Sequence, residues 1–515
     1  MKMPHECQIR RHACAQGAGP SSYGRKAMSE QKQGQGTFKK ELSRVSIFSL
    51  ALGAIIGWGC FVLPGTSFLP DGGSLGAMIG MLLGGIIICI ISVSYAYLIP
   101  KFPLSGGEFV YADAAFGKKH AFVCGWMIIL AYWSLIPLNS TALAMISRYL
   151  IPGSPFQVGY LYTIAGWDVY LGEIALAYVF IIGLAIMNIK GIKSAGWFQT
   201  VVALSLLGSV IFVLVGVLIT QPDFSNLKPY FVEGKSGFAC ILAIIAFAPY
   251  CFVGFDCIPQ AAQEYKFSHK KVLPIMLGAI MAGAFIYIAV IFVTAVVEPW
   301  SEMLAANPDW ATGEMIQESI GYIGVFFIGI AMLCAVISGM NAFYISSSRL
   351  MYSMSYADAL PEQFGKLTPQ GTPKLAIIFM MALALIAPWF GRQVLSWIVD
   401  MTCVGAAIGF IYTCASATVI AKREGNTKQM VISGLGIAVA SIFLIITFVP
   451  GMPGFLSVPS FIILGVWVVL GIVFYLSVKD TYINGKWKGI GIYDILCQKA
   501  EEEKAAEAAQ VAEAE

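Results

Sequence analysis

The sequence predicts an all-α integral membrane protein with twelve transmembrane helices, two of them broken near the middle. Of its 515 residues, 58% are hydrophobic and only 12% are charged, which is unlike an ordinary soluble domain. Apolar runs of about 17 to 25 residues, long enough to cross a bilayer, recur along the chain. Two of these runs carry glycine and proline where a span should be most regular, and the sequence therefore predicts broken helices 1 and 6.

Twelve apolar runs define the expected spans. In chain order they cover residues 45–63, 75–100, 121–150, 171–189, 198–219, 238–263, 272–297, 320–352, 375–390, 394–421, 431–449 and 455–478. The ninth run is the shortest, and a re-entrant segment is the alternative interpretation. Pro373 before it and Gly391 after it are nevertheless ordinary helix stops, so it is counted as a span.

Lysine and arginine in the loops predict the orientation. Every predicted inner loop carries two or three of them, whereas the outer loops hold only Lys228, Lys235 and Arg392. Because positive loops stay in the cytoplasm, both termini are expected there, in a multi-pass protein of the cell membrane that contacts the lipid bilayer. The net charge of +3 reflects this asymmetry, and no nucleic acid partner is expected.

The two tails are polar. Residues 1–40 lack the apolar stretch of a signal peptide and are expected to form a disordered cytoplasmic tail. Met28 is a second candidate start, so whether residues 1–27 are translated stays open. Residues 479–515 form an acidic cytoplasmic tail, and neither tail is assigned a function.

The first interrupted run contains Gly57 and Gly59 on either side of Trp58, with Pro64 shortly after. Unwinding here frees backbone N–H groups at the start of a half-helix, which together attract an anion such as a carboxylate. The predicted binding residues are Ile56, Gly57, Trp58 and Gly59. The alternative is that Gly53 and Gly57, four residues apart, only form a helix-packing face.

The second interrupted run offers the opposite polarity. Ahead of Gly254, the carbonyls of Tyr250, Cys251 and Val253 would have no partner within the helix and would attract a cation such as an ammonium group. Phe252 and Gly254 complete this predicted half of the site, in which aromatic side chains either shape a pocket or belong to the core. Amides for a carboxylate beside carbonyls for an ammonium outline an α-amino acid.

Four sequence segments, in order, carry a resemblance to a known family. Residues 53–65, 103–117, 252–264 and 341–364 resemble the first-helix, post-helix-2, sixth-helix and post-helix-8 signatures of the amino acid, polyamine and organocation (APC) permeases. The resemblance covers residues 40–480. It identifies the family more specifically than the substrate.

The resemblance implies a LeuT-type fold with a 5+5 inverted repeat. Residues 41–220 would form the first repeat (helices 1–5), residues 237–421 the second (helices 6–10), and residues 430–478 the peripheral helices 11 and 12. Relatives commonly carry a small residue where this chain has Trp58, so the size of the pocket and the orientation of this indole stay open.

Three side chains within the spans have a functional and a structural interpretation. Asp256 is a candidate gate or proton-coupling residue, or a cap of the restarted helix. Asn139 lines the pocket by resemblance, or makes an interhelical hydrogen bond. Ser338 is a candidate ligand for Na⁺, or bonds back to its own helix. The coupling ion, H⁺ or Na⁺, stays open, and no other cofactor is expected.

Two charged residues are expected at the cytoplasmic edge. Glu264 lies near Lys266 and His269 and is predicted to be an interfacial charge, whereas Arg349 is predicted to anchor the end of helix 8.

These features predict a secondary active transporter that carries a neutral zwitterionic amino acid by alternating access. The alternatives in transport are an amino acid exchanger and a carrier of amines or polyamines; outside transport they are a channel and a nontransporting amino acid sensor. An enzyme is not expected, because no catalytic residues, metal-ligand spacing or phosphate-binding motif occurs. The carried amino acid and the oligomeric state stay open.

Overall fold

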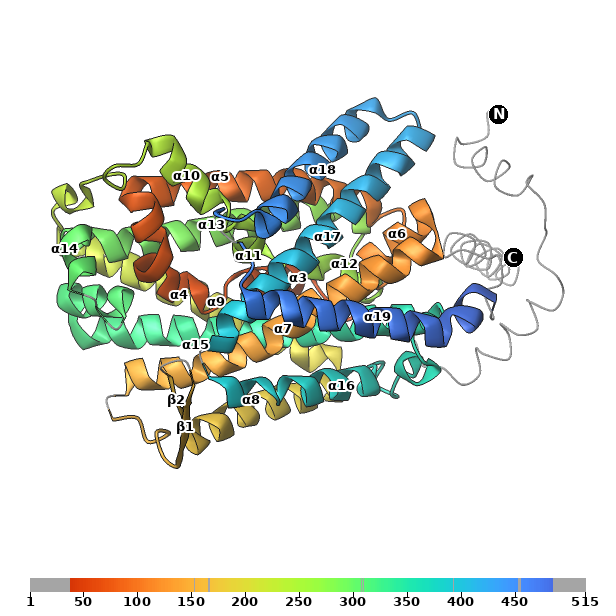
Figure 1. Ribbon diagram of the computed structural model, residues 1–515, viewed down its shortest axis with the longest axis horizontal. Coiled ribbons are helices and arrows are strands. Elements are labelled where there is room, and N and C mark those ends of the chain that lie inside the picture. Colours follow the sequence, from red (N-terminus) through yellow and green to blue (C-terminus); the bar gives the residue numbers. More distant parts are fainter. Residues whose placement is uncertain are drawn as a thin grey trace, which may run out of the picture.

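The computed structural model describes residues 38–484, except residues 152, 165–166, 307, 309, 392 and 453–454. The predicted disordered tail, residues 1–40, lies outside the described residues except for residues 38–40. The predicted acidic tail, residues 479–515, also lies outside them except for residues 479–484, which continue the last helix. The described chain is mostly helical, with one two-stranded sheet (Figure 1).

The elements follow one another closely along the chain. The helices of the first half are α3 (Arg44–Ile55), α4 (Gly59–Leu63), the π-helical turn η1 (Pro64–Phe68), α5 (Leu69–Leu98), α6 (Glu108–Phe116), α7 (Lys118–Leu150), α8 (Leu171–Lys190), α9 (Ile192–Ile219) and the 3₁₀ turn η2 (Phe224–Leu227). Those of the second half are α10 (Gly237–Ile245), α11 (Ala248–Phe252), α12 (Cys257–Gln260), η3 (Ala262–Glu264), η4 (His269–Lys271), α13 (Val272–Val296), α14 (Trp300–Ala305), α15 (Ala311–Tyr356), η5 (Glu362–Gly365), α16 (Lys374–Ala384), η6 (Ala387–Phe390), α17 (Gln393–Arg423), α18 (Thr427–Phe448) and α19 (Val458–Asn484).

Nine helices in the described residues are long and apolar enough to cross a membrane, or up to ten if the bent pair Gly237–Ile245 and Ala248–Gln260 is one span. The segments Arg44–Ile55 and Lys374–Phe390 are shorter apolar helices. This supports a multi-pass membrane protein, whereas the count of twelve stays a prediction.

Two helices are longer than their predicted spans because each continues across a glycine kink. Gly73 in α5 has φ 69°, and Gly321 in α15 has φ 70°, backbone conformations that favour glycine. The predicted spans 75–100 and 320–352 begin at these kinks, so hydropathy located the apolar part and not the polar or amphipathic turns before it.

Burial separates central helices from peripheral ones. The most apolar stretch of α7 is 83% buried, whereas that of α19 is only 6% buried, so α19 lies at the periphery. α15 packs against α7 and α9, and α17 packs against α7 and α18. The nine described cysteines that lie within the helices are free thiols.

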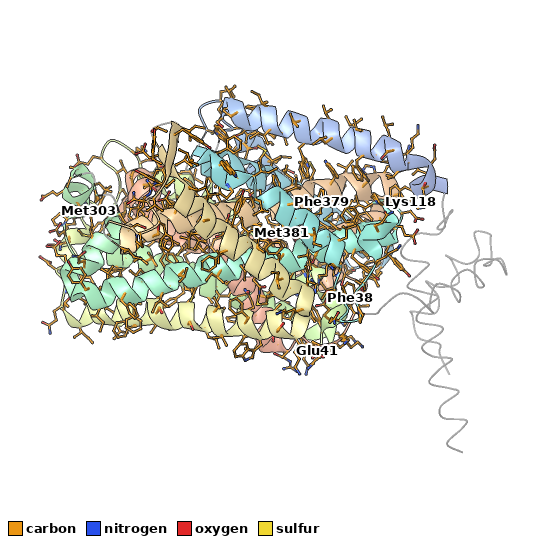
Figure 2. All side chains as sticks on the ribbon, turned by 90° about the horizontal axis from the view of Figure 1, so that it is seen from below. Phe38, Glu41, Lys118, Met303, Phe379 and Met381 are labelled. Carbon is orange, nitrogen blue, oxygen red and sulfur yellow. The ribbon has the colours of Figure 1, made fainter. Side chains whose placement is uncertain are left out.

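The two ends of the molecule carry different connections. At one end lie α14 and the antiparallel hairpin of β1 (Tyr160–Ile164) and β2 (Trp167–Tyr170), and at the other lies α6 (Figure 1). Phe38 and Glu41 lie at the end opposite Met303 of α14 (Figure 2). The two breaks lie between these ends, where α3, α4 and α11 meet (Figure 1).

Candidate functional site

The first gap separates α3 from α4. The N–H of Ile56 still donates to the carbonyl of Leu52, and Ile56 then turns to an extended conformation with ψ 105°. The next three backbone N–H groups, of Gly57, Trp58 and Gly59, donate no hydrogen bond to any described residue. Trp58 and Gly59 are buried and Gly57 is partly buried. Three consecutive free donors are what the sequence predicts for an anion site.

The second gap separates α11 from α12. α11 ends at Phe252, and Gly254 has φ 124°, where a side chain is strained. Within the described part of the chain, the carbonyls of Tyr250, Cys251 and Val253 receive no hydrogen bond. They are therefore available acceptors for a donor such as an ammonium group.

The two gaps lie against each other. A Cβ atom added to Gly254 would lie 2.6 Å from the carbonyl carbon of Ala54 and 2.8 Å from the nitrogen of Ile55. A Cβ atom added to Gly59 would lie 3.2 Å from the hydroxyl oxygen of Tyr250. Free donors of one broken helix and free acceptors of the other thus share one buried region.

Asn139 of α7 faces the first gap. Its Nδ2 donates to the carbonyl of Leu135 at 2.8 Å, but its Oδ1 is buried without a partner among the described residues. That oxygen lies 3.5 Å from where a Cβ atom of Gly57 would be, and the side chain is only 3% exposed. The structure thus places Asn139 beside the gap, with an unused acceptor toward it.

Asp256 fastens the second gap. Its Oδ1 accepts the N–H of Gly254 at 2.7 Å, and its Oδ2 accepts the hydroxyl of Tyr132 at 3.1 Å. The hydroxyl of Tyr132 also lies 3.0 Å from the carbonyl oxygen of Asp256. This carboxyl group holds the unwound loop through the N–H of Gly254, but it accepts no hydrogen bond from the first turn of α12, so it does not cap the restarted helix as the structural interpretation expected. Its role in gating or proton coupling stays a prediction.

A second buried carboxyl group, which sequence reasoning missed, is linked to Asp256. Nε2 of Gln260 donates to Oε2 of Glu108 at 2.5 Å and lies 3.4 Å from the hydroxyl of Tyr132. Burial raises the pKa of the Glu108 carboxyl well above its usual range, and the nearby Asp256 adds to the rise. An acidic residue directly after Gly107, at the end of the glycine-rich loop, is the signal that would have found it.

Trp58 and Trp310 lie around the first gap. Trp58 is only 8% exposed, and its indole N–H has no partner among the described residues. Trp310, outside the predicted spans, donates its indole N–H to the carbonyl of Phe61 at 2.9 Å and stacks on Tyr149. The half-helix α4 is thereby covered by aromatic rings from α7 and from the start of α15.

Ser338 of α15 contacts the first broken helix. Its hydroxyl lies 3.1 Å from the carbonyl oxygen of Gly53 and 3.1 Å from that of Ala335, to which it can donate. The contact with Ala335 is the bond back to its own helix, and the contact with Gly53 places the hydroxyl beside helix 1, as the ion-ligand interpretation requires. A role as an ion ligand stays a prediction.

Glu264 corrects the sequence-based expectation of an interfacial charge. Its side chain and that of Arg349 are both 0% exposed, and Nε of Arg349 donates to Oε1 of Glu264 at 3.0 Å, so Glu264 is a buried ion-pair partner, whereas the anchoring role of Arg349 stays a prediction. The N–H groups of Glu41 and Leu42 donate to the carbonyl of Glu264, and the ring of Phe38 lies beneath the guanidinium. The sequence missed this pairing because its partners are far apart in the chain.

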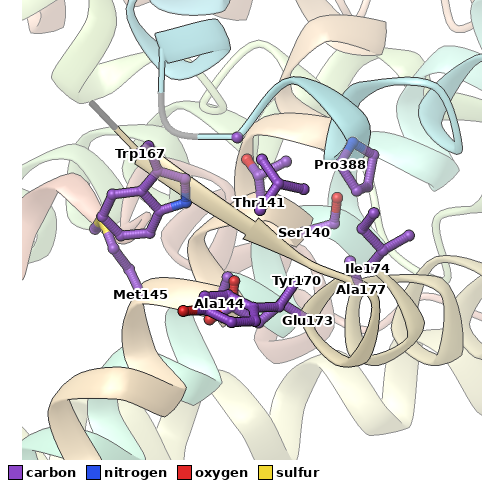
Figure 3. A pocket seen from close by; sticks show the side chains of 12 residues that line it. Ser140, Thr141, Ala144, Met145, Trp167, Tyr170, Glu173, Ile174, Ala177 and Pro388 are labelled. Atoms are coloured by element: carbon purple, nitrogen blue, oxygen red, sulfur yellow. The ribbon is translucent and has the colours of Figure 1, made fainter. Parts of the chain in front are cut away.

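A separate small cavity lies toward the hairpin end, between α7, α8 and β2 (Figure 3). Ser140, Thr141, Trp167 and Glu173 contribute to its lining, and its volume is about 20 Å³. A cavity needs about 10–15 Å³ of such volume to hold a single water molecule, so this one is too small for an amino acid. The Glu173 carboxylate is also already paired with Arg148 at 2.6 Å.

Known proteins similar to this chain are transporters. The amino acid permease family matches residues 42–474. The chain is 25% identical over 467 residues to the branched-chain amino acid permease BcaP of Bacillus subtilis, a match that covers 88% of this chain and 96% of that protein.

Two further relatives have related names. The serine/threonine exchanger SteT of Bacillus subtilis is 26% identical, over 68% of this chain and 76% of its own length. The histidine permease HisP of Lactococcus lactis is 24% identical, over 72% of this chain and 77% of its own length. Because the family match spans nearly all of the described residues, including both broken helices, the chain belongs to the amino acid permease family.

Proposed function

We propose that this protein is a secondary active transporter that moves a neutral, zwitterionic amino acid across the cytoplasmic membrane by alternating access. The α-carboxylate binds the N–H groups of Gly57, Trp58 and Gly59. The ammonium group binds the carbonyls of Tyr250, Cys251 and Val253. Oδ1 of Asn139 is a further acceptor beside the gap.

One observation carries this proposal: buried, unpaired donors and unpaired acceptors from two broken helices lie side by side. Unpaired backbone groups at membrane depth are costly unless they line a cavity or meet a ligand. An amino acid headgroup presents acceptors and donors of the matching kinds, and it needs no charged side chain in the site. A polyamine lacks the carboxylate that the free N–H groups favour.

The proposal includes the architecture that the sequence predicts. Twelve spans follow if the bent pair counts as one span and the two shorter apolar segments also cross the membrane. Breaks in helices 1 and 6 fall at equivalent places of a 5+5 inverted repeat, with both termini in the cytoplasm. The bundle of helices 1, 2, 6 and 7 then rocks against the remaining helices.

The buried carboxyl groups favour protons as the coupling ion of the proposed transport. Asp256 and Glu108 are connected through Tyr132 and Gln260 next to the second gap. A proton on this pair removes a buried charge when the gap changes shape, which links protonation to the conformational cycle.

Exchange is a second candidate, favoured by the similarity to a serine/threonine exchanger. An exchanger requires an amino acid inside the vesicle to leave as the external one enters, whereas a proton-coupled carrier does not. Preloaded vesicles accumulate label without a pH gradient if the protein is an exchanger, whereas empty vesicles with a pH gradient accumulate it if the protein is a proton-coupled carrier.

The test is uptake by the purified protein in liposomes, with all twenty amino acids and common amines as substrates. It is run with and without a pH gradient, with Na⁺ replaced by choline, and with preloaded and empty vesicles. Accumulation of at least one neutral amino acid is expected. Binding without accumulation under every condition indicates a sensor and refutes transport, and accumulation of amines alone refutes the zwitterion site.

A further inference from the structure

A chain of three buried carboxamides connects α8, α15 and α9 to the first broken helix. Nδ2 of Asn188 donates to Oδ1 of Asn341 at 2.8 Å, and Nδ2 of Asn341 donates to Oε1 of Gln199 at 2.8 Å. Nε2 of Gln199 then donates to the carbonyl of Ser49 on α3 at 3.2 Å. All three carboxamides are at most 1% exposed, and all are uncharged.

Backbone carbonyls orient this chain. Nδ2 of Asn188 also donates to the carbonyl of Leu184 at 2.9 Å, and Nδ2 of Asn341 also donates to the carbonyl of Ala195 at 3.2 Å. A flipped amide would turn an oxygen toward one of these carbonyls, so the donors all run in the same direction. Because all the carboxamides donate in this one direction, the NH₂ group of Gln199 is the last donor of the hydrogen-bonded series and contacts α3.

The end of α3 is shaped to receive this amide. A Cβ atom added to Gly53 would lie 2.3 Å from Nε2 of Gln199 and 2.7 Å from Cβ of Ser338, so only glycine fits there. The carbonyl of Gly53 has lost its helical donor, because the N–H of Gly57 is free, and the hydroxyl of Ser338 lies 3.1 Å from it. Gly53 therefore serves a close contact with α9 and α15.

We propose that Gln199 is a positioning residue for transport, an inference that rests on the function proposed above. Its carboxamide, oriented by Asn341 and Asn188, holds the last two turns of α3 against α9 and α15. The start of the first gap is thereby held in one place, and the free N–H groups of Gly57 and the two residues after it are presented to the substrate.

The first test replaces Gln199 with leucine, which keeps the size of the side chain and removes its polar atoms. The apparent KM for uptake is expected to rise about tenfold, because fewer molecules hold α3 in the binding position, with a much smaller change in the maximal rate. The matched control is Gln429→Leu. Gln429 is also a buried glutamine, but it bonds to Ser433 within the same peripheral helix, α18, and its loss should leave KM unchanged.

The second test, Gln199→Glu, separates positioning from mere packing. An ionised carboxylate cannot donate to the carbonyl of Ser49, whereas a protonated carboxyl group can. Because burial without a cationic partner raises the pKa of a carboxyl group, uptake by this variant relative to the wild type is expected to recover at least about fivefold between about pH 9 and about pH 6. A packing defect would give the same loss at both pH values.

No titratable group contacts Gln199 in the described residues, so a pH dependence of the Gln199→Glu variant can be assigned to the new carboxyl group. The groups that contact it from α3 and α15 are Ser49, Gly53, Ser338 and Asn341, none of which titrates in this range. On its own helix the nearest charged residue is Lys193, which is exposed. On α15 the nearest charge is Arg349, two turns beyond Asn341, which is paired with Glu264.

The outcomes distinguish this inference from the proposed function. If the wild type transports no amino acid, the proposed function fails. If the wild type transports and both variants elute as monodisperse protein, either of two results shows that the positioning role is wrong. The first is a wild-type KM for Gln199→Leu, and the second is no recovery of uptake by Gln199→Glu when the pH is lowered. If neither variant folds, Ser338→Ala replaces them: it removes the bond to the Gly53 carbonyl, should raise KM in the same way, and a wild-type KM again overturns the role.

Discussion

The replacement Gly254→Ala tests whether the two gaps must touch. Gly254 has φ 124°, and a non-glycine residue in such a conformation costs about 1–3 kcal/mol. Its methyl group would also lie 2.6 Å from both the carbonyl carbon and Cβ of Ala54, where the backbone has to move and not a flexible side chain. Overpacking of this kind costs about 1–3 kcal/mol more.

The sum is about 2–6 kcal/mol: the overpacking is relieved if α3 moves away from the second gap, and the φ strain is relieved if the loop at residue 254 changes its conformation. Either change separates the donors from the acceptors. Because about 1.4 kcal/mol is a factor of ten, uptake should fall at least about thirtyfold even at the lower limit.

The assay measures initial uptake in liposomes together with the thermal unfolding of the detergent-solubilised protein. Gly434→Ala is the matched control, because nothing lies within 4 Å of a Cβ atom at that position of α18. The control should keep wild-type uptake. Wild-type uptake and an unchanged unfolding temperature in Gly254→Ala would refute the close approach of the two gaps.

The remaining predictions concern single polar contacts. Asn139→Leu removes the free Oδ1 beside the first gap and should raise the KM for uptake about tenfold without loss of folded protein, whereas an unchanged KM would exclude Asn139 from the site. Tyr132→Phe removes the hydroxyl bonded to Asp256, and should lower the stability by about 1 kcal/mol and shift the pH profile of uptake; an unchanged profile argues against proton coupling through this carboxyl. Glu264→Gln leaves Arg349 buried without its charged partner and should destabilise the protein by about 3–5 kcal/mol, seen as a lower unfolding temperature, and a temperature equal to that of the wild type would contradict the burial of this pair.

The positions of the gaps could be predicted from the sequence because their causes are local. Glycine at 57, 59 and 254 and proline at 64 and 249 act on their own backbone, through φ/ψ freedom or through a missing N–H. Hydropathy likewise reports the apolar length of each helix. Backbone breaks and apolar length both depend on residues that are neighbours in sequence, and the structure has broken helices at the positions that these residues predict.

The side-chain partners could not be predicted because they depend on packing between distant helices. Gln199 lies in a span whose other residues indicate only a membrane helix, and its role appears only when Ser49 and Asn341 are next to it. Glu264 was predicted to be an interfacial charge because Lys266 and His269 lie near it in sequence, yet its side chain pairs with Arg349 in the interior. Single-sequence rules assign charge to the surface unless a partner is known.

The proposed binding site is made of main-chain groups, and such a site would also explain how one architecture serves different amino acids. Every α-amino acid presents the same carboxylate and ammonium group, and the N–H groups and carbonyls at the two gaps do not depend on which side chains surround them. Substitutions around the site, at positions such as Trp58, Asn139 and Tyr250, can then change the space for the substrate side chain while the headgroup contacts persist. This separation is consistent with a family in which relatives only 24–26% identical to this chain are named for branched-chain amino acids, serine and threonine, or histidine. For the proposed site we therefore expect the flanking side chains to set the choice of substrate, so that variants at Trp58 should change which amino acid is preferred before they abolish uptake.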